Sequence, residues 1–297
     1  MTGSPVPNTP RLPDTSPLPD ASTLLNETAQ AQASTLLAAS PVANGPAIRE
    51  LHDMADFEAV SLLYADIWGS EPGQSPLSAE AMRALSHAGN YVAGAYEDGR
   101  LVGASVAFFG EPIGASLHSH ITGAVMGRGV GLALKTHQRQ WALARGLTRI
   151  TWTYDPLIRR NAYFNLVKLG ARPEEYLTSF YGAMDDAING GDESDRVLAA
   201  WDLTAPAPPE PIEPPVGAAH ALRDRGGRPE TVATDADTVL IDLPDDIEAL
   251  RRTDPGAARA WRLAVRHTLG GLLADGARVT GFHERRRYVV RRTPPRS

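Results

Sequence analysis

The sequence predicts a mixed α/β fold, and three observations carry that prediction. Segments with the two-residue period of strands alternate along the chain with segments that have the period of helices. Two strand segments flank Asp98-Gly99, a dipeptide that supplies the positive φ angles of a tight hairpin turn. A third strand segment, Ser116 to Val125, runs directly into a glycine-rich turn and then a helix. We therefore expect an α/β domain.

Composition divides the 297 residues into four parts. Residues 1–46 are rich in Pro, Ser, Thr and Ala and have few large apolar side chains, so they cannot offset the entropy lost on ordering, and we expect a disordered tail. Residues 205–217 read APAPPEPIEPPVG, a composition that favours a stiff polyproline II linker. These segments leave residues 47–204 as the main domain and residues 218–297 as a C-terminal α/β appendage.

The main domain begins with a strand, two helices and a hairpin. Ala47 to Leu51 is the first strand, and a helix follows whose apolar face holds Phe57, Val60, Tyr64, Ile67 and Trp68. Ser78 can cap a second short helix. The hairpin strands are Tyr91 to Tyr96 and Leu101 to Phe109.

The rest of the main domain continues with alternating elements. We expect a strand at Ser116 to Val125, a helix at Leu132 to Arg145, a strand at Thr148 to Thr153, a helix at Arg159 to Leu169 and closing strands near Glu175 to Tyr181 and Arg196 to Leu203. The order of elements is then βααβββαβαββ.

The sequence of the appendage predicts a strand, two helices and a hairpin. Thr238 to Leu243 alternates as a strand, and Asp245 to Arg251 can form a short helix. Asp254-Pro255 caps a longer helix, with a final hairpin from Val279 to Val290. The buried stripe of the longer helix is Trp261, Val265, Thr268, Leu269 and Leu272. The appendage is too small to bury enough apolar surface by itself. We therefore expect the main domain to cover this stripe, within one chain or across a homodimer.

Composition also limits the class of protein. Without cysteine, the chain has no disulfide, no thiolate nucleophile and no Cys-ligated metal. The net charge of −6 argues against nucleic acid as the main partner. No apolar run is long enough to span a membrane and no targeting segment is visible, so we expect a cytoplasmic protein without membrane association.

The segment Met126 to Gly131 carries the strongest chemical signal. Glycines at alternating positions let the main chain approach a bulky anion, and the first turn of the following helix offers free N–H groups and the positive end of its dipole. A pyrophosphate fits this arrangement. The alternative, a Rossmann fingerprint, needs GxGxxG in an early βαβ unit and an acid about 20 residues on. Here the glycines run GxGxG, three strands come earlier and the acid is Asp155, so the alternative fits less well.

The same residues carry a family resemblance. Gly127-Arg128-Gly129-Val130-Gly131 resembles motif A of the GNAT superfamily of acyl-CoA N-acyltransferases, Q/R-x-x-G-x-G/A. The stretches LHSH at 117–120, TWTYDPL at 151–157 and SDR at 194–196, with Asn161, are similar to a bacterial subgroup of predicted acetyltransferases, some of which are amino-acid N-succinyltransferases. The resemblance covers residues 47–204 and, more faintly, the appendage.

The resemblance implies a GNAT fold, whose mixed sheet has splayed fourth and fifth strands. It further implies acetyl-CoA or another acyl-CoA such as succinyl-CoA as co-substrate, an amine as acceptor and no metal. The pantetheine arm would pair along the open edge of Ser116 to Val125. The implied CoA contacts are Ala124, Val125, Met126, Gly127, Arg128, Gly129, Val130, Gly131, Leu132 and Asn161. Met126 replaces the Gln or Arg of the motif, which should weaken binding without abolishing it.

His118 and His120 are the candidate bases, because they stand two apart on one strand and share a face. Paired histidines on this strand also resemble arylalkylamine acetyltransferases. The alternative is that one or both are structural. For the acid, the tyrosine that many GNAT enzymes use falls on Leu166, so Tyr163 is our candidate, with Tyr154 and Tyr181 as other phenols nearby.

Two residues are candidates for substrate contact, each with a structural alternative. Asp155 could hold the acceptor's ammonium or simply begin a turn with Pro156. Arg196 could recognise a carboxylate or form a salt bridge at the start of a strand. Asn161 could likewise cap a helix instead of contacting the cofactor.

These features together predict an N-acyltransferase that moves an acetyl or succinyl group from acyl-CoA to a small-molecule primary amine such as an amino acid. The alternative is a GNAT-like module that binds acyl-CoA and acts through protein contacts. A metal site would need a third ligand beside His118 and His120, and a Ser hydrolase would need G-x-S-x-G; neither pattern is present.

Overall fold

The computed structural model describes residues 45–69, 75–126, 128–182, 193–205 and 214–293. The predicted tail lies outside these residues except for its last two positions, as do Gly127 and the centre of the predicted linker. None of the helices in these ranges is long and apolar enough to cross a membrane.

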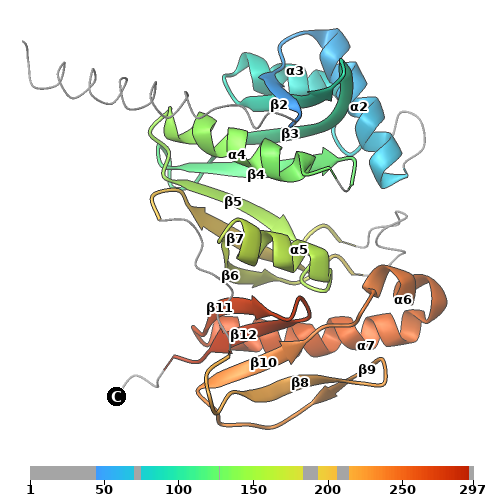
Figure 1. The fold of residues 1–297 in the computed structure, drawn as a ribbon, viewed down its shortest axis with the longest axis vertical. Coiled ribbons are helices and arrows are strands. Elements are labelled where there is room, and N and C mark those ends of the chain that lie inside the picture. The colour runs from blue at the N-terminus through green and yellow to red at the C-terminus, as the bar shows by residue number, and fades with distance from the viewer. Residues whose placement is uncertain (1–44, 70–74, 127, 183–192, 206–213, 294–297) are drawn as a thin grey trace, which may run out of the picture. The chain divides into compact units, whose positions relative to one another are not determined.

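The first sheet has seven strands, in the spatial order β1-β2-β3-β4-β5-β7-β6 (Figure 1). The strands are β1 (Ala47–Glu50), β2 (Tyr91–Glu97), β3 (Arg100–Gly110), β4 (Ser116–Ala124), β5 (Arg149–Tyr154), β6 (Arg172–Leu177) and β7 (Arg196–Asp202). All neighbours are antiparallel except β4 and β5, which are parallel. The sheet is therefore mixed, as predicted.

Helices cover both faces of this sheet. The helices α2 (Met54–Trp68) and α3 (Ala79–His87) enclose an apolar cluster on one face, in which Phe57 packs with Val106 of β3. The helix α4 (Val130–Leu143) packs on the other face of the sheet, where Leu134 is buried against Val102. Together with α5 (Arg159–Tyr163), the order of elements is the predicted βααβββαβαββ. That prediction is confirmed.

Two local predictions are confirmed by backbone geometry. Ser78 caps α3 by accepting a hydrogen bond at 3.2 Å from the N–H of Ala81. Asp98 and Gly99 have φ angles of 49° and 75°, which close the hairpin between β2 and β3.

β4 and β5 pair at one end only. Their register covers three pairs, beginning at Ser116 with Arg149 and ending at His118 with Thr151. On the other side of β4, Ser119 pairs with Ala107 and Ile121 pairs with Val106, so His120 is the extra residue of a β-bulge. Because β4 bends at this bulge, its later residues leave β5. This is the splay expected of a GNAT fold, and that fold class is confirmed.

The helix predicted at Arg159 to Leu169 changes type midway. It is α-helical through Tyr163 and continues as a π-helix, η1 (Phe164–Lys168). A π-helical turn is rare and occurs frequently at functional sites. The wider turn lies beside the splay, in the wall of the cavity described below.

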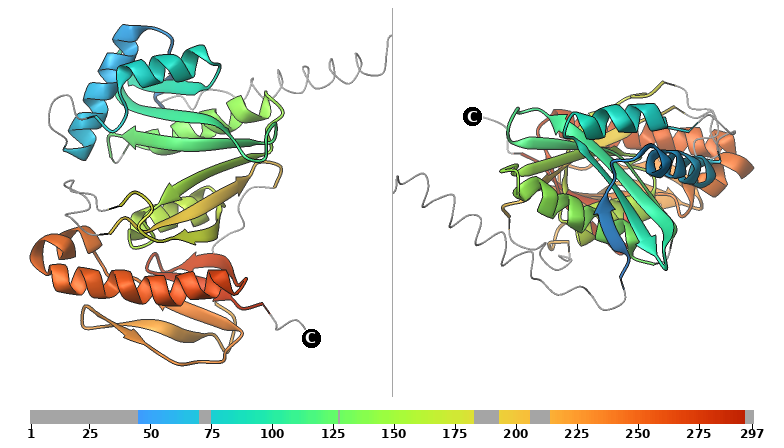
Figure 2. Two further views of the ribbon diagram at one scale, coloured as in Figure 1. Left: turned by 180° about the vertical axis from the view of Figure 1, so that it is seen from behind. Right: turned by 90° about the horizontal axis from the view of Figure 1, so that it is seen from above.

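The C-terminal residues form a second sheet, in the order β11-β12-β10-β8-β9 (Figure 2). Its strands are β8 (Ala219–Arg225), β9 (Arg228–Thr231), β10 (Thr238–Asp242), β11 (Arg278–His283) and β12 (Arg287–Arg291). Its helices are α6 (Ile247–Thr253), α7 (Pro255–Val265), η2 (Arg266–Gly270) and α8 (Gly271–Ala274). The α/β appendage is confirmed, and it contains one hairpin, β8–β9, that the sequence did not predict.

One apolar cluster joins the two sheets. The predicted stripe of α7 and η2 is buried, with Trp261, Val265 and Leu269 fully inaccessible, and all three belong to the same cluster as Leu117 and Ile150 of the first sheet. The strand β6 packs against η2 and α8, and β11 packs against η1. The main domain therefore covers the stripe within one chain.

Candidate active site

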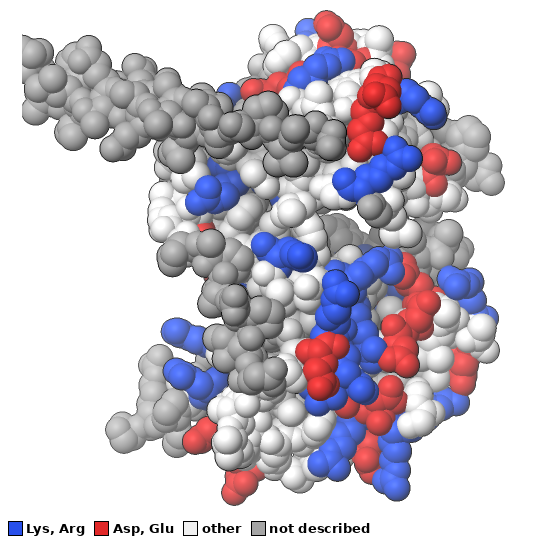
Figure 3. Space-filling view, viewed as in Figure 1, with Lys and Arg blue, Asp and Glu red and all other residues white. Residues whose placement is uncertain are grey.

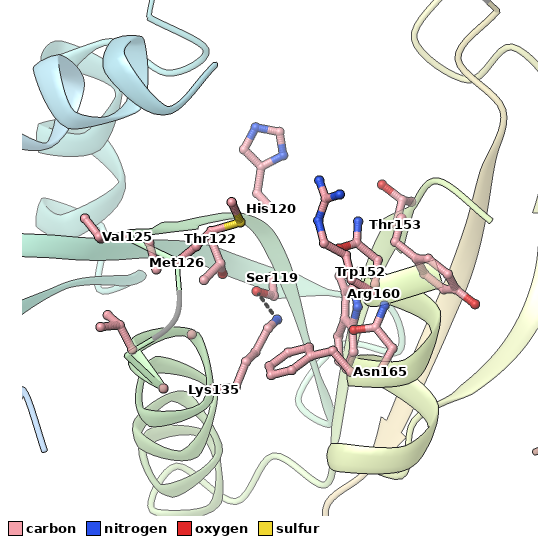
Figure 4. Close-up of a pocket in the computed structure, with 17 residues that line it drawn as sticks. Ser119, His120, Thr122, Val125, Met126, Lys135, Trp152, Thr153, Arg160 and Asn165 are labelled. Carbon is pink, nitrogen blue, oxygen red and sulfur yellow. Dashed lines mark hydrogen bonds between the residues drawn. The ribbon is translucent and has the colours of Figure 1, made fainter. Parts of the chain in front are cut away.

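A pocket of about 400 Å³ lies where β4 and β5 diverge (Figure 4). Its walls come from both strands, the turn after β4, the first turns of α4, and α5 with η1. The described residues that line it include three basic side chains, His120, Lys135 and Arg160, and no carboxylate. The pocket is therefore suited to a negatively charged ligand.

One end of the pocket is the N-terminus of α4. Gly129 is the N-cap with φ of 72°, and Gly131 lies in the first turn. A Cβ atom added at either glycine would meet nothing within 4 Å, so packing against the protein does not require glycine there. The first N–H groups of a helix lack intrahelical partners, and together with the dipole they attract anions. The open space beside these groups fits a pyrophosphate.

The middle of the pocket is the open edge of β4. Beyond His118, β4 no longer pairs with β5, while its other edge stays paired with β3 up to Ala124. The backbone groups of β4 from Ser119 on therefore face the pocket instead of a strand. Such an edge can pair with an extended amide-bearing chain, as a further strand would. The arm of CoA contains two amides in an extended chain, which fits this edge.

A buried polar network lies on the α4 side of β4. Lys135 is 5% exposed, and its ammonium donates to Ser119 Oγ at 2.8 Å and to Gln138 Oε1 at 3.4 Å. The same ammonium lies 4.1 Å from the ring centroid of Trp152 on β5. Gln138 in turn donates to Ser105 Oγ at 3.2 Å. Figure 4 shows the lysine reaching from α4 to Ser119, which is the first residue of β4 beyond its pairing with β5.

The environment of Lys135 favours its neutral form. Burial lowers the pKa of its ammonium from 10.5 to about 7. Its hydrogen-bond partners Ser119 and Gln138 are neutral, so they solvate the charge without neutralising it. This lysine can therefore exchange a proton near neutral pH.

The opposite side of β4 carries the two predicted histidines. In Figure 4 His120 extends away from Lys135, on the other side of the strand. Its ring packs on Phe108 with centroids 5.7 Å apart, and partial burial lowers its pKa below the ordinary value. His120 lines the pocket, so it can accept a proton from a ligand there.

His118 is held differently. Its Nδ1 lies 3.0 Å from Thr151 Oγ1, and it does not line the pocket. Burial, with smaller contributions from His120 and Lys135, lowers its pKa to about 4. The ring of His118 is therefore held neutral beside Thr151, outside the pocket lining.

The pocket wall on α5 presents a guanidinium. Arg160 points to the same side of the pocket as His120 in Figure 4 and is held by Glu248 of α6, with Nη2 donating to Oε1 at 2.7 Å. Thr153 of β5 lies beside it in the pocket wall, and Thr153 Oγ1 is 3.2 Å from Tyr181 Oη. A ligand carboxylate near His120 would therefore find a cation.

The predicted CoA contacts divide into two groups. Those that line the pocket are Ala124, Val125, Met126, Gly129, Val130, Gly131 and Asn161. Arg128 points elsewhere, because it pairs with Glu97 at 2.6 Å, and Leu132 does not line the pocket. Asn161 is not a cap, since α5 has Ile158 at its N-cap position.

Asp155, for which the sequence offered either substrate contact or a turn start, is buried at the end of β5. It is 5% exposed, and Arg262 binds both of its oxygens, at 3.0 and 3.1 Å, while Arg251 donates at 2.6 Å. Its Oδ1 also accepts from the N–H of Leu157 at 2.9 Å, as in a turn start. Burial alone would raise the pKa of Asp155, but Arg262 and Arg251 outweigh burial and hold it below the ordinary range. Both arginines that bind this carboxylate therefore come from the appendage.

Tyr163 and Arg196 also lie outside the pocket lining. The ring of Tyr163 is covered by the guanidinium of Arg285, 4.1 Å from its centroid. Arg196 donates to the carbonyl of Asp195 at 2.9 Å and lies 5.4 Å from the ring centroid of Tyr181. Tyr181 is the residue that connects it to the pocket wall at Thr153.

Lys135 and Arg160 are the basic pocket residues that the sequence analysis did not predict. A usable signal was present, because Lys135 follows Gly131 by four residues and so shares its helix face. Arg160 gave no comparable signal, since it stands in a run of two arginines at 159 and 160.

Solved structures that are similar to this chain include acetyltransferases that match about half of it. The N-acetyltransferase from Staphylococcus aureus Mu50 is 17% identical over 54% of this chain and 99% of its own, with a TM-score of 0.45. The ribosomal-protein-S18-alanine N-acetyltransferase from Escherichia coli is 13% identical over 55% and 96%, with a TM-score of 0.43. The yncA protein from Salmonella typhimurium, solved with its cofactor acetyl-CoA, is 16% identical over 56% and 98%, with a TM-score of 0.45. No family model and no curated protein matches the sequence.

Proposed function

We propose that this chain is a GNAT-type N-acyltransferase that moves an acyl group from acyl-CoA to a primary amine. The observation that carries the proposal is the open edge of β4, which starts after His118 and ends beside a helix N-terminus with open space at Gly129 and Gly131. An anion site and an unpaired strand edge in one pocket suit a ligand with a pyrophosphate and an extended amide chain. Acetyl-CoA and succinyl-CoA both meet this description.

The acceptor side supports a small amine that carries a carboxylate, such as an amino acid. His120 and Arg160 point to the same side of the pocket, so one can face the amine and the other the carboxylate (Figure 4). The guanidinium of Arg160 carries five N–H donors, so it can bind a ligand carboxylate beside its ion pair with Glu248. Asp155, already held by two arginines, has no part in this proposal.

The reaction is direct attack of the amine on the thioester carbonyl. His120 takes a proton from the ammonium and leaves a nucleophilic amine. At its bulge, where the pairing with β5 has ended, the backbone of β4 can offer an N–H to the carbonyl oxygen as negative charge develops there. Binding both substrates in one pocket also accelerates the reaction, because the two reactants are already held close together.

The test is product mass. The full chain is incubated with a mixture of acetyl-CoA and succinyl-CoA and a pool of amino acids. We expect a new amide, whose mass identifies donor and acceptor, and an equal amount of free CoA. If acyl-CoA binds but neither amide nor free CoA forms above a protein-free control, the chain is a binding module and the proposed activity is wrong.

A further inference from the structure

Lysine is rare in this chain, and one of its two lysines lies in the pocket. Of the 29 basic residues, 27 are arginines, and lysine occurs only at 135 and 168. Lys168 is exposed, whereas Lys135 is buried among Ser119, Gln138 and Trp152. A guanidinium stays charged in proteins, but a buried lysine amine can lose its proton. Position 135 therefore carries the type of basic side chain that can gain and lose a proton.

The two proton-exchanging groups of the pocket stand on opposite sides of β4. Lys135 rises from α4, one turn after Gly131, on the side where the phosphate end of CoA is assigned. His120 lies on the other side, toward Arg160 (Figure 4). The thiol end of CoA must reach the splay from the α4 side, because its phosphates are held there. In an acyl transfer the attacking nitrogen and the departing sulfur lie on different sides of the carbonyl carbon. The nitrogen can therefore lie near His120 while the sulfur lies near Lys135.

Resting on the proposed function, we infer that Lys135 is the general acid of the reaction, which protonates the departing thiolate of CoA. The slot that GNAT enzymes fill with tyrosine is Leu166 here, 3% exposed in the apolar cluster. Tyr163 lies outside the pocket lining, and the hydroxyl of Tyr154, 3.3 Å from that of Tyr288, is buried. Lys135 is a proton donor that is both in the pocket and on the cofactor side of β4.

The surroundings of Lys135 can accommodate both its protonated and its neutral form. Its hydroxyl and amide partners can solvate the ammonium, while burial brings its pKa to about 7 and so limits the cost of the neutral amine. The titratable side chains on the elements packed against its helix are Glu50 of β1, Tyr91 of β2 and Tyr154 of β5, with His118 and His120 on the far side of β4. Glu50, the carboxylate among them, accepts from Trp141 at 2.9 Å, well along the helix.

The proton balance closes with these residues. The amine nitrogen forms a bond to the carbonyl carbon, the carbon–sulfur bond breaks, and its electron pair stays on sulfur. Lys135 gives its proton to that sulfur and becomes a neutral amine. The acceptor nitrogen gives up two protons, one to His120 before the attack and one to water as the amide forms. Lys135 is protonated again from solvent once CoA leaves, and the net reaction releases one proton.

The experiment compares Lys135→Met and Lys135→Arg with wild type and with the control Lys168→Met. Wild-type turnover is established first, because its absence would refute the proposed function instead of this inference. We expect both Lys135 variants to lose about 10²-fold in kcat with little change in KM for acyl-CoA. Lys168→Met should keep wild-type kinetics. Thermal melting of each variant shows whether its fold is intact.

The pH dependence of kcat separates a proton donor from a fixed positive charge. An acid must be protonated to act, so wild-type kcat should fall as the pH rises through the pKa of Lys135 in the complex, and this alkaline limb should vanish in Lys135→Met. A Lys135→Arg variant with wild-type kcat would overturn the inference, because only charge would be needed. So would a Lys135→Met variant whose KM rises for succinyl-CoA alone at unchanged kcat, since Lys135 would then bind the acyl carboxylate.

A measurement without substrate gives an independent readout. With lysine labelled by ¹³C at Cε, the chain gives only two lysine resonances, and the one lost in Lys135→Met belongs to Lys135. We expect that resonance to titrate near pH 7 in the free protein. A titration near the ordinary lysine value of about 10.4 would contradict the proton-donor role.

Discussion

Two buried charged groups flank β5, and they are built in opposite ways. At the end of the strand, Asp155 is enclosed by Arg251 and Arg262, and each of its oxygens is bonded. On the α4 side of the same strand, Lys135 is equally inaccessible but is bonded only to neutral groups in the contacts described. The first group is electrostatically compensated, and the second is not.

The difference separates a structural role from a chemical one. A buried carboxylate with two guanidiniums is costly to disturb, and here it fastens α6 and α7 of the appendage to the end of β5. A buried cation without a counter-ion costs stability in the free protein, and such a cost is expected where a ligand or a reaction uses the group. Basic and acidic side chains are interspersed over the lower part of the surface in Figure 3. One such ion pair joins Arg160 of α5 to Glu248 of α6.

The largest effect is expected at Asp155. Asp155→Asn should lower the free energy of unfolding by about 3–5 kcal/mol, because two buried guanidiniums lose their anion. Because the pKa of Asp155 is depressed, its contribution is present above the ordinary aspartate pKa of about 3.9 and shrinks as the pH falls below it. Urea unfolding measures the difference, with the exposed Asp275→Asn as control. Unchanged stability with lost activity would instead restore Asp155 as a substrate contact.

His120 should affect turnover without affecting stability. His120→Gln is expected to lower kcat by about 10²-fold and to remove the acidic limb of the pH–rate profile. A base must be neutral, and burial lowers the pKa of His120, so that limb should lie below the ordinary pKa of 6.5. The exposed His87→Gln serves as control. An unchanged rate and profile would assign the base to another group or to water.

Lys135→Met should change stability in the direction opposite to Asp155→Asn. The folded pKa of Lys135, about 7, lies below the unfolded value, so the unfolded state binds more protons between these values and wild-type stability rises with pH there. The variant removes this cost, which the pKa shift puts at up to about 5 kcal/mol, but it also loses the hydrogen bonds to Ser119 and Gln138. We therefore expect a gain on the order of 2 kcal/mol below pH 7 that shrinks toward pH 10. Urea unfolding at pH 6 and pH 10 measures it. A variant less stable than wild type at pH 6 would show that the lysine is structurally compensated.

Most of the fold could be predicted because its signals are local. Alternation, the cap at Ser78 and the turn at Asp98-Gly99 each lie within a few residues, and the order of elements followed from them. The hairpin β8–β9 was missed because its strands are rich in charged residues and do not alternate cleanly. The π-helix η1 was missed because its residues read as ordinary helix.

The site was predicted less completely because its partners are distant in sequence. The glycine-rich turn was recognised from its own residues, but Asp155 meets arginines 96 and 107 residues away, which no local pattern reveals. The sequence predicted that Lys135 lies in a helix, but not that it is buried. Its burial depends on Ser119 of β4 and Trp152 of β5, which the fold brings together.

Binding of CoA to Gly131→Asp tests the account most directly. The matched control is Gly271→Asp, because Gly271 is also helical and a Cβ there likewise meets nothing within 4 Å. Both variants should melt as wild type does. Calorimetry should show CoA affinity unchanged in Gly271→Asp and at least about 10-fold weaker in Gly131→Asp, because a carboxylate would face the pyrophosphate. Equal affinity in both variants would contradict the assignment of the pocket to CoA.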